Sequence, residues 1–224
     1  MGRPSLLSVL TCLLAVALPG AVPPNIVAEG VPAVTPALTT ELTPYLNLGG
    51  AGFRGWHATR REALVTTRVG DASHLHLMAA PLAKRVALTG GVEPVKSGRM
   101  QPGGTLLLYA ADRGGDENYQ LHLKDLADPQ AKPARLTDGK SRNLSACWSP
   151  DGRRIAYATN RRNGKDNDIV VVEARPPYAE RIVHAGTSSG WSPVEWSPDG
   201  ARLLLRQSLG QTETRLWTMD VATT

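Results

Sequence analysis

Trp148-Ser149-Pro150-Asp151-Gly152 occurs a second time as Trp196-Ser197-Pro198-Asp199-Gly200, 48 residues further along the chain. Proline fixes φ and favours a tight turn, and the Asp-Gly pair supplies the positive φ that such a turn needs. A fixed period of about 40 to 50 residues is typical of repeat architectures. The two strings therefore predict a fold built from repeated units.

The unit that begins at the first string has the pattern of four short strands. A short apolar run ending at Trp148 precedes the turn, and Arg154–Thr159 follows it as a predicted strand. Asp168–Glu173 is rich in β-branched residues, and Glu180–His184 follows a Pro-Pro break. Four strands in a period of about 45 residues are typical of a β-propeller blade. Trp148 is expected to pack between neighbouring blades.

Two weaker copies of the unit stand upstream in the same register. Met100–Gly104 occupies the place of the turn string, and Trp56 precedes a degenerate one. We therefore expect an all-β fold, a partial β-propeller of about three and a half four-stranded blades over residues 48–224. The expected blades cover about 52–90, 96–138, 144–185 and 192–224, the last one lacking its outer strand.

Propellers close with about four to eight blades. The count therefore predicts a fragment of a longer propeller or, as the alternative, a chain that closes by self-association through its open blade edge.

The N-terminal residues 1–21 have the layout of a secretory signal peptide. A short positive start, Met1–Pro4, precedes an uncharged apolar stretch, Leu6–Leu18. This stretch is shorter than the roughly 20 residues that a membrane span needs. We expect export to the periplasm or the medium and cleavage after Ala17 or near Ala21, with no stable membrane span afterwards; an uncleaved anchor is the alternative.

Residues 22–47 are predicted to be a linker with one short helix. Thr35 suits the cap and Pro36 the first helical position, with Leu38 and Leu42 on one face. Pro44 is expected to end the helix near Leu42 or Thr43.

The basic balance of the chain does not predict nucleic-acid binding. The net charge is +5, from 25 Lys and Arg against 20 Asp and Glu. The dense pairs Arg153-Arg154 and Arg161-Arg162 lie beside Gly-containing turns, where solvated charge is the expected role. Removal of the signal peptide would leave Cys147 as the single cysteine, which we expect to be buried as a small hydrophobic residue.

The repeat resembles known propellers of two kinds. Trp148–Tyr157 followed by Asp168–Val172 resembles both bacterial Tol-system propellers and the N-terminal propellers of bacterial prolyl oligopeptidase-family serine peptidases, of dipeptidyl or acylaminoacyl peptidase type. Other segments resemble the peptidases more closely, over roughly residues 35–224. These segments are Leu42–Asn47, Asp112–Leu121, Leu136–Asn143 and Gly190–Gly200.

The peptidase resemblance implies a propeller that covers an α/β-hydrolase domain and limits its substrates to peptides. That domain carries the catalytic Ser, Asp and His, and we expect it to be missing from this chain. The segment Gly186-Thr187-Ser188-Ser189-Gly190 matches the G-x-S-x-G pattern of such enzymes. It is followed by a predicted strand rather than a helix, and no His follows it, so a turn between blades is expected and no catalytic residue is assigned.

Few residues suggest a ligand. Asp116 and Glu117 form the acidic pair that could hold the amine of a peptide substrate, although solvation of a loop is the simpler reading. His74 and His76 have a chelating spacing without a third ligand nearby, which favours a solvated or cross-strand pair. Asp166–Asp168 lacks the spacing of a calcium loop and is interpreted as a hairpin turn. No metal and no cofactor are predicted.

Two functions remain open from the sequence. One is the substrate-gating propeller part of an exported prolyl oligopeptidase-like peptidase, inactive alone. The other is a non-enzymatic periplasmic propeller of Tol type that binds protein partners.

Overall fold

A computed structural model describes residues 26–46, 49–70, 72–128 and 130–222 of the chain. The chain divides into two compact units, Met1–Leu48 and Gly49–Thr224. The predicted signal peptide lies outside the described residues. Among those that are described, no helix is long and apolar enough to cross a lipid bilayer.

The first unit contains one helix, α1 (Pro36–Leu46), which begins as predicted. The Thr35 hydroxyl accepts a hydrogen bond from the amide three residues later, at 3.2 Å, and so caps the helix. The predicted end near Leu42 is wrong, because the helix continues through Pro44. Pro44 lacks an N–H and removes one backbone hydrogen bond. The Thr43 hydroxyl, 2.7 Å from the carbonyl oxygen four residues earlier, adds a bond in the same turn.

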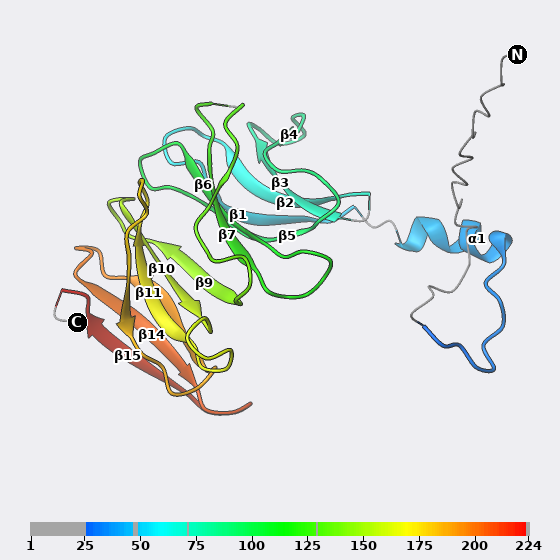
Figure 1. Ribbon diagram of the computed structural model, residues 1–224. Helices are drawn as coiled ribbons and strands as arrows, with labels where there is room; N and C mark the ends of the chain where they lie inside the picture. The colour runs from blue at the N-terminus through cyan, green and yellow to red at the C-terminus, as the bar shows by residue number, and fades with distance from the viewer. Residues whose placement is uncertain (1–25, 47–48, 71, 129, 223–224) are drawn as a thin grey trace, which may run out of the picture. The chain divides into compact units, whose positions relative to one another are not determined.

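The second unit is made of four antiparallel sheets, as Figure 1 shows. In each sheet the strands follow one another in chain order. The strands are β1 (Ala51–Trp56), β2 (Ala63–Val69), β3 (Ala72–Met78) and β4 (Val86–Ala87); β5 (Val95–Met100), β6 (Leu106–Ala111), β7 (Gln120–Asp125) and β8 (Ala134–Arg135); β9 (Asn143–Trp148), β10 (Arg154–Thr159), β11 (Asp168–Glu173) and β12 (Glu180–His184); and β13 (Trp191–Trp196), β14 (Arg202–Ser208) and β15 (Thr214–Asp220).

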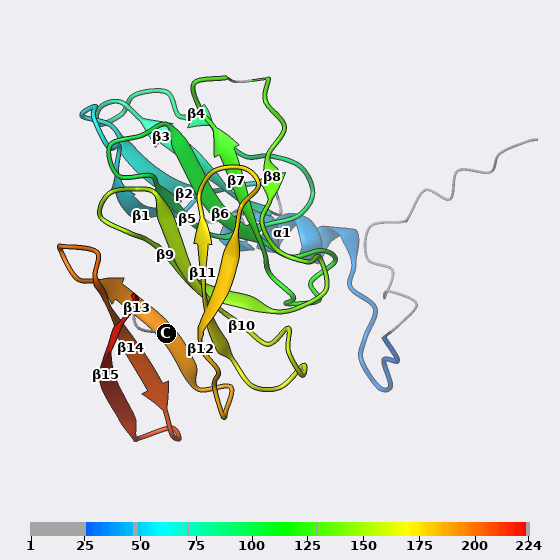
Figure 2. The ribbon, with the colours of Figure 1, turned by 60° about the vertical axis from the view of Figure 1, so that its left-hand side comes forward.

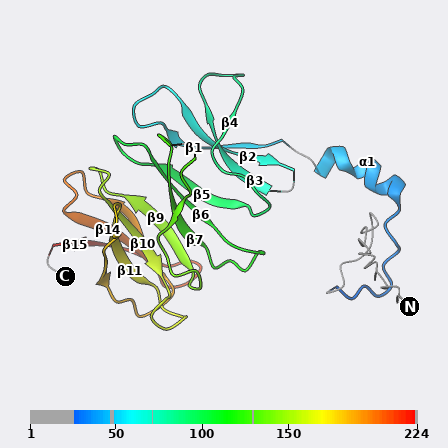
Figure 3. The same cartoon turned by 45° about the horizontal axis from the view of Figure 1, so that its top comes forward.

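The four sheets are the blades of an open β-propeller, which confirms the predicted fold class. Figures 2 and 3 show the sheets fanned out side by side. Strand β1 contacts β5, and β9 contacts β13, so the first strands of the first two blades meet, as do those of the last two. The first strand of each blade is therefore its inner strand. In the described chain the fourth blade contains three strands.

Apolar side chains from neighbouring blades fill the space between them. One cluster joins the first and second blades, around Leu75 and Leu107. A second joins the second and third blades, around Tyr157, and a third joins the third and fourth, around Ile169 and Leu203. All five of these side chains are at most 1% exposed. Burying one such side chain fully contributes about 1.5–3 kcal/mol, so the interfaces between blades hold the fan together.

The repeated turn has the same hydrogen bonds in both copies. The Ser149 hydroxyl donates to the Asp151 carboxylate at 2.6 Å and accepts from the Arg154 amide at 2.9 Å. Its counterpart Ser197 has the same two bonds, at 2.6 and 2.9 Å. The hydrogen bond from Ser149 lowers the pKa of Asp151 below its usual value. This network explains why the chain repeats Ser and Asp at these positions.

Each turn also fastens its blade to the next. The Gln101 amide donates to the Gly152 carbonyl at 2.8 Å, and the Arg154 guanidinium donates to the Gly200 carbonyl at 2.8 Å. The Trp148 indole N–H donates to a carbonyl of β5 at 3.3 Å. Trp196 makes the matching bond to a carbonyl of β9 at 3.4 Å. The predicted place of these tryptophans between blades is therefore confirmed.

Candidate functional site

Every inner strand contains an irregularity in its pairing with the second strand of its blade. In each case the inner strand holds one residue more than the strand opposite, which defines a β-bulge. The residues at the bulges are Arg54 in β1, Lys96 in β5, Ser145 and Ala146 in β9, and Val194 in β13. A bulge changes the direction in which nearby side chains point, because it interrupts the regular alternation of the strand. Each of the four inner strands has such an interruption.

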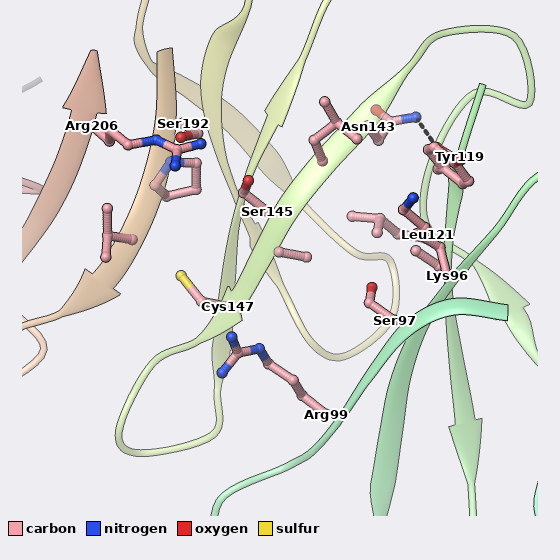
Figure 4. Close-up of a pocket in the computed structure, with 15 residues that line it drawn as sticks. Lys96, Ser97, Arg99, Tyr119, Leu121, Asn143, Ser145, Cys147, Ser192 and Arg206 are labelled. Atoms are coloured by element: carbon pink, nitrogen blue, oxygen red, sulfur yellow. Dashed lines mark hydrogen bonds between the residues drawn. The ribbon is translucent and has the colours of Figure 1, made fainter. Parts of the chain in front are cut away.

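The bulges of three blades border one pocket of about 440 Å³. Figure 4 shows the pocket, which is lined by β5, β9 and β13, by Arg206 of β14 and by residues of the second blade. Three cationic side chains, Lys96, Arg99 and Arg206, line it. No Asp or Glu is among the lining residues. The pocket is thus an electropositive hollow between inner strands, of a size suited to a small ligand.

The cations approach the pocket from different blades. In the view of Figure 4, Ser145 and Cys147 lie between Arg206 and Arg99. The Lys96 ammonium lies 5.4 Å from the centre of the Tyr119 ring, within the range of a cation–π contact. Cations on two blades therefore face one hollow.

Polar groups of the pocket wall are held by the backbone. The Asn143 amide donates to the carbonyls of Tyr119 and Ser141, at 2.9 and 2.8 Å. Ser145 has φ +55°, which non-glycine residues rarely adopt. Such conformations cluster at binding and catalytic sites. The bulge and the unusual φ of Ser145 together mark this stretch of β9 as a candidate site.

Cys147 is buried, as predicted, and its burial disfavours the thiolate form. Burial raises the pKa of its thiol to about 12, which outweighs the opposing effect of the nearby Arg99 charge. The thiol is therefore protonated at neutral pH, whereas nucleophilic cysteines act as thiolates.

Asp116 and Glu117 lie elsewhere, in the loop between β6 and β7. The Asp116 carboxylate accepts from the Asn118 amide at 2.9 Å, and the Glu117 amide donates to the Asp112 carboxylate at 3.1 Å. Both side chains are exposed, and neither lines the pocket. A role for this pair in substrate binding stays a prediction.

The Ser188 segment is a turn between blades, as predicted. It connects β12 to β13, and the next element is a strand rather than a helix. The Ser188 carbonyl accepts from the Asn167 amide at 2.9 Å, and the Asn167 side chain donates to the Ser189 carbonyl at 2.7 Å. The serine is thus part of a loop fastened to the neighbouring blade and has no elbow geometry.

Charged residues near this loop have partners that the sequence did not indicate. Arg161 and Arg162 are exposed, in line with the expected solvated charge, and in addition Arg161 pairs with Glu180 at 2.6 Å and Arg162 pairs with Asp168 at 2.9 Å. Asp168 begins β11, the strand predicted as Asp168–Glu173, and follows the hairpin connection from β10; its burial, at 1% exposure, was not predicted. The carboxylate accepts a hydrogen bond from the Gly186 amide in the connection between β12 and β13, and pairing with Arg162 compensates for its desolvation.

His74 and His76 are also more buried than a solvated pair would be, at 4% and 6% exposure. His76 Nδ1 lies 3.0 Å from the hydroxyl of Thr67 on β2, and His74 Nε2 lies 3.1 Å from the Gly91 carbonyl. Within the described ranges, no three His, Cys, Asp or Glu side chains are grouped so that they could hold a metal ion.

Sequence reasoning missed the pocket itself. One signal was available in the sequence. Lys96 and Arg99 lie just before the turn at Met100–Gly104, in the place where the clearest repeat has a short apolar run, so charge at these positions is unusual. Arg206 gave no signal, since it lies on β14 of another blade and reaches the pocket only through the packing of the blades.

Comparison with known proteins agrees with the β-propeller fold. Residues 90–223 match the family model of the prolyl oligopeptidase N-terminal β-propeller domain. The chain belongs to this family. The first blade lies upstream of the matched residues. No curated protein matches the chain in sequence.

Solved structures with the same fold include both kinds of protein that the repeat resembles. A TolB-type protein from Agrobacterium tumefaciens has a TM-score of 0.58 at 20% identity, over 71% of this propeller chain and 57% of that one. TolB from Acinetobacter baumannii has a TM-score of 0.59 at 15% identity, over 78% and 42%. Prolyl oligopeptidase B from Galerina marginata has a TM-score of 0.56 at 16% identity, over 76% and 29%. At these identities the likeness shows the fold alone, and the propeller chain spans about half or less of each protein.

Proposed function

We propose that this chain is the substrate-gating propeller part of an exported prolyl oligopeptidase-like serine peptidase. The family match over residues 90–223 carries the proposal. In such an enzyme the propeller would admit peptides and exclude folded proteins, and a separate α/β-hydrolase domain would supply the catalytic Ser, Asp and His. The chain alone would then have no peptidase activity.

The geometry of Ser188 supports the proposed lack of activity. A nucleophilic serine needs a base within hydrogen-bond reach and an oxyanion hole. The nearest His in sequence, His184, packs against Trp191 instead, with the two rings tilted by 54° and their centres 4.3 Å apart. The Ser188 hydroxyl instead accepts from the Gly190 amide at 3.3 Å.

Hydrolysis of dipeptide-amide and acyl-amino-acid reporters by the purified chain tests the proposal. We expect no turnover above the buffer rate, for the chain and for Ser188→Ala alike. Turnover that Ser188→Ala abolishes would show an active site in this chain and contradict the proposal.

A non-enzymatic propeller of TolB type that binds protein partners is the second candidate. The similarity to two TolB structures, with TM-scores of 0.58 and 0.59, favours it. The DNA that follows the Thr224 codon separates the two functions. A reading frame with a G-x-S-x-G elbow, then Asp and His, supports the peptidase. A stop codon after further blades supports the partner-binding propeller.

Export is a separate part of the proposal and has its own measurement. The apolar stretch Leu6–Leu18 after a positive start supports a cleaved signal peptide. Expression of the full chain in a bacterium, followed by fractionation and N-terminal sequencing, should give a periplasmic protein that begins near residue 18 or 22. A cytoplasmic protein that still begins at Met1 would contradict export.

A further inference from the structure

We propose that the pocket between the inner strands binds carboxylate groups of peptides, so that this propeller favours acidic peptides. The proposal rests on the proposed gating function and assigns it a substrate class. It depends on three properties of the pocket: its charge, its free hydrogen-bond donors and its apolar surface.

The charge of the pocket is of one sign. Lys96, Arg99 and Arg206 line it without a carboxylate. Acidic residues line other hollows: Glu195 lines one together with Arg99, and Asp112 lines another together with Lys96. No acidic residue lines a described hollow together with Arg206. A cleft lined by one sign of charge concentrates ligands of the opposite sign.

The donors of the pocket are available to a ligand. Among the described residues, no ion pair or hydrogen bond partner is seen for the guanidinium groups of Arg99 and Arg206. The hydroxyl groups of Ser97, Ser145 and Ser192 line the same hollow. Figure 4 shows Ser192 beside Arg206 and Ser145 between the two arginines. Arginine forks and hydroxyls are well suited to carboxylate oxygens, because they donate several hydrogen bonds in fixed directions.

The rest of the wall suits the body of a peptide. Leu121, Leu144, Pro193 and Val194 give it an apolar surface beside the cations. A free inorganic anion would leave this surface uncovered, whereas a peptide covers it and places a carboxylate among the donors. The carboxylate could come from an acidic side chain or from a free C-terminus, and the experiment separates the two sources.

Fluorescence anisotropy of labelled peptides with the purified chain tests the proposal. The first peptide has two Glu residues and an amidated C-terminus, and the second has Gln in their place. The third has Gln and a free C-terminus, and the fourth has Lys and an amide. We expect the Glu peptide to bind about tenfold more tightly than its Gln counterpart, because each charged hydrogen bond contributes about that factor. Tighter binding of the third peptide instead would assign the pocket to the C-terminal carboxylate.

Two double variants locate the effect. Arg99→Gln with Arg206→Gln should remove the preference for carboxylates. Arg153→Gln with Arg175→Gln makes the same change in net charge at exposed arginines outside the pocket and should keep the preference. A preference that both double variants lose equally would reduce the effect to net charge and overturn the proposal.

The two proposals fail in different ways. Equal binding of all four peptides would overturn the carboxylate preference and leave the gating propeller standing. Binding of none of them would overturn the carboxylate preference and would also count against a peptide-admitting propeller.

Discussion

Gly152 lies in the repeated turn with φ +66°, directly against the neighbouring blade. A Cβ at this position would lie 2.6 Å from the Pro102 carbonyl oxygen, a backbone atom that cannot move aside cheaply. The repeated Ser-Pro-Asp-Gly turn of this chain thus has two physical causes. Asp and Ser organise the turn, and glycine permits both its φ and the close approach of the next blade.

Replacing Gly152 by Ala should therefore destabilise the chain more than the same change at a free turn. We expect a loss of about 3 kcal/mol, of which about 1–2 kcal/mol comes from the left-handed φ and the remainder from the contact with Pro102. Urea unfolding followed by tryptophan fluorescence measures the difference.

Gly164→Ala is the matched control. Gly164 lies in the same blade with φ +74°, and nothing lies within 4 Å of a Cβ built there. The Gly164→Ala variant should lose only about 1–2 kcal/mol of unfolding free energy. Equal losses at the two positions would mean that the approach to Pro102 does not contribute.

The connection between β10 and β11 is fastened to the connection between β12 and β13 by one buried carboxylate. Asp168 accepts two hydrogen bonds from Arg162 Nε and Nη2, both at 2.9 Å, and a third from the Gly186 amide at 2.9 Å. Arg162 also donates to the Gly186 carbonyl at 2.7 Å. The cluster thus joins two connections at the same end of the third blade.

Asp168→Asn should destabilise the chain by about 2–3 kcal/mol, since the charged hydrogen bonds are lost and an amide N–H faces the Gly186 amide. Thermal unfolding followed by circular dichroism measures the change. Asp166→Asn, two residues away, alters a half-buried side chain that accepts a hydrogen bond from Asn163 at 2.9 Å and should change the stability little. A similar loss in both variants would show that the burial of Asp168 does not matter.

Strands and turns were predictable from the sequence, and contacts between blades were not. The 48-residue spacing between Trp148 and Trp196 predicted where the strands of each blade lie, because each repeat contains its own turn sequence. The sequence predicts Asp168 at the start of its strand, but the Gly186 amide that bonds to its carboxylate lies 18 residues further along the chain, so the local sequence did not indicate its burial. The bulge at Lys96 could not be predicted either, because an extra residue in a strand breaks the alternation of apolar and polar residues by which strands are recognised in a sequence.

Protonation links several blades to the stability of the unit as a whole. Burial lowers the pKa of four histidines and is the largest cause of the shift in each. These are His57, His76, His122 and His184. The folded chain keeps these imidazoles neutral at a pH where the unfolded chain protonates them. The unfolded state then binds more protons, and stability falls as the pH drops through the ordinary value of 6.5.

We therefore expect a lower melting temperature at about pH 5 than at about pH 7.5, with the decline beginning near the ordinary histidine pKa. His122→Gln should flatten this dependence. His122 is stacked on Tyr109 at 5.1 Å, and the Arg135 charge beside it adds to the lowering of its pKa. A melting temperature that stays constant over this range, in the chain and in the variant alike, would rule out the linkage.

The bulges on the inner strands have a consequence for how such a propeller can change its ligands. A bulged residue stands outside the regular ladder, so a substitution there leaves the pairing of its strand intact. Arg54, Lys96 and Val194 are such positions, one on each of three blades. The fold thus separates the residues that build it from those that line its centre. Substitutions at these positions would change the side chains that line the described pockets one blade at a time, while the turns and interfaces that hold the blades stay as they are.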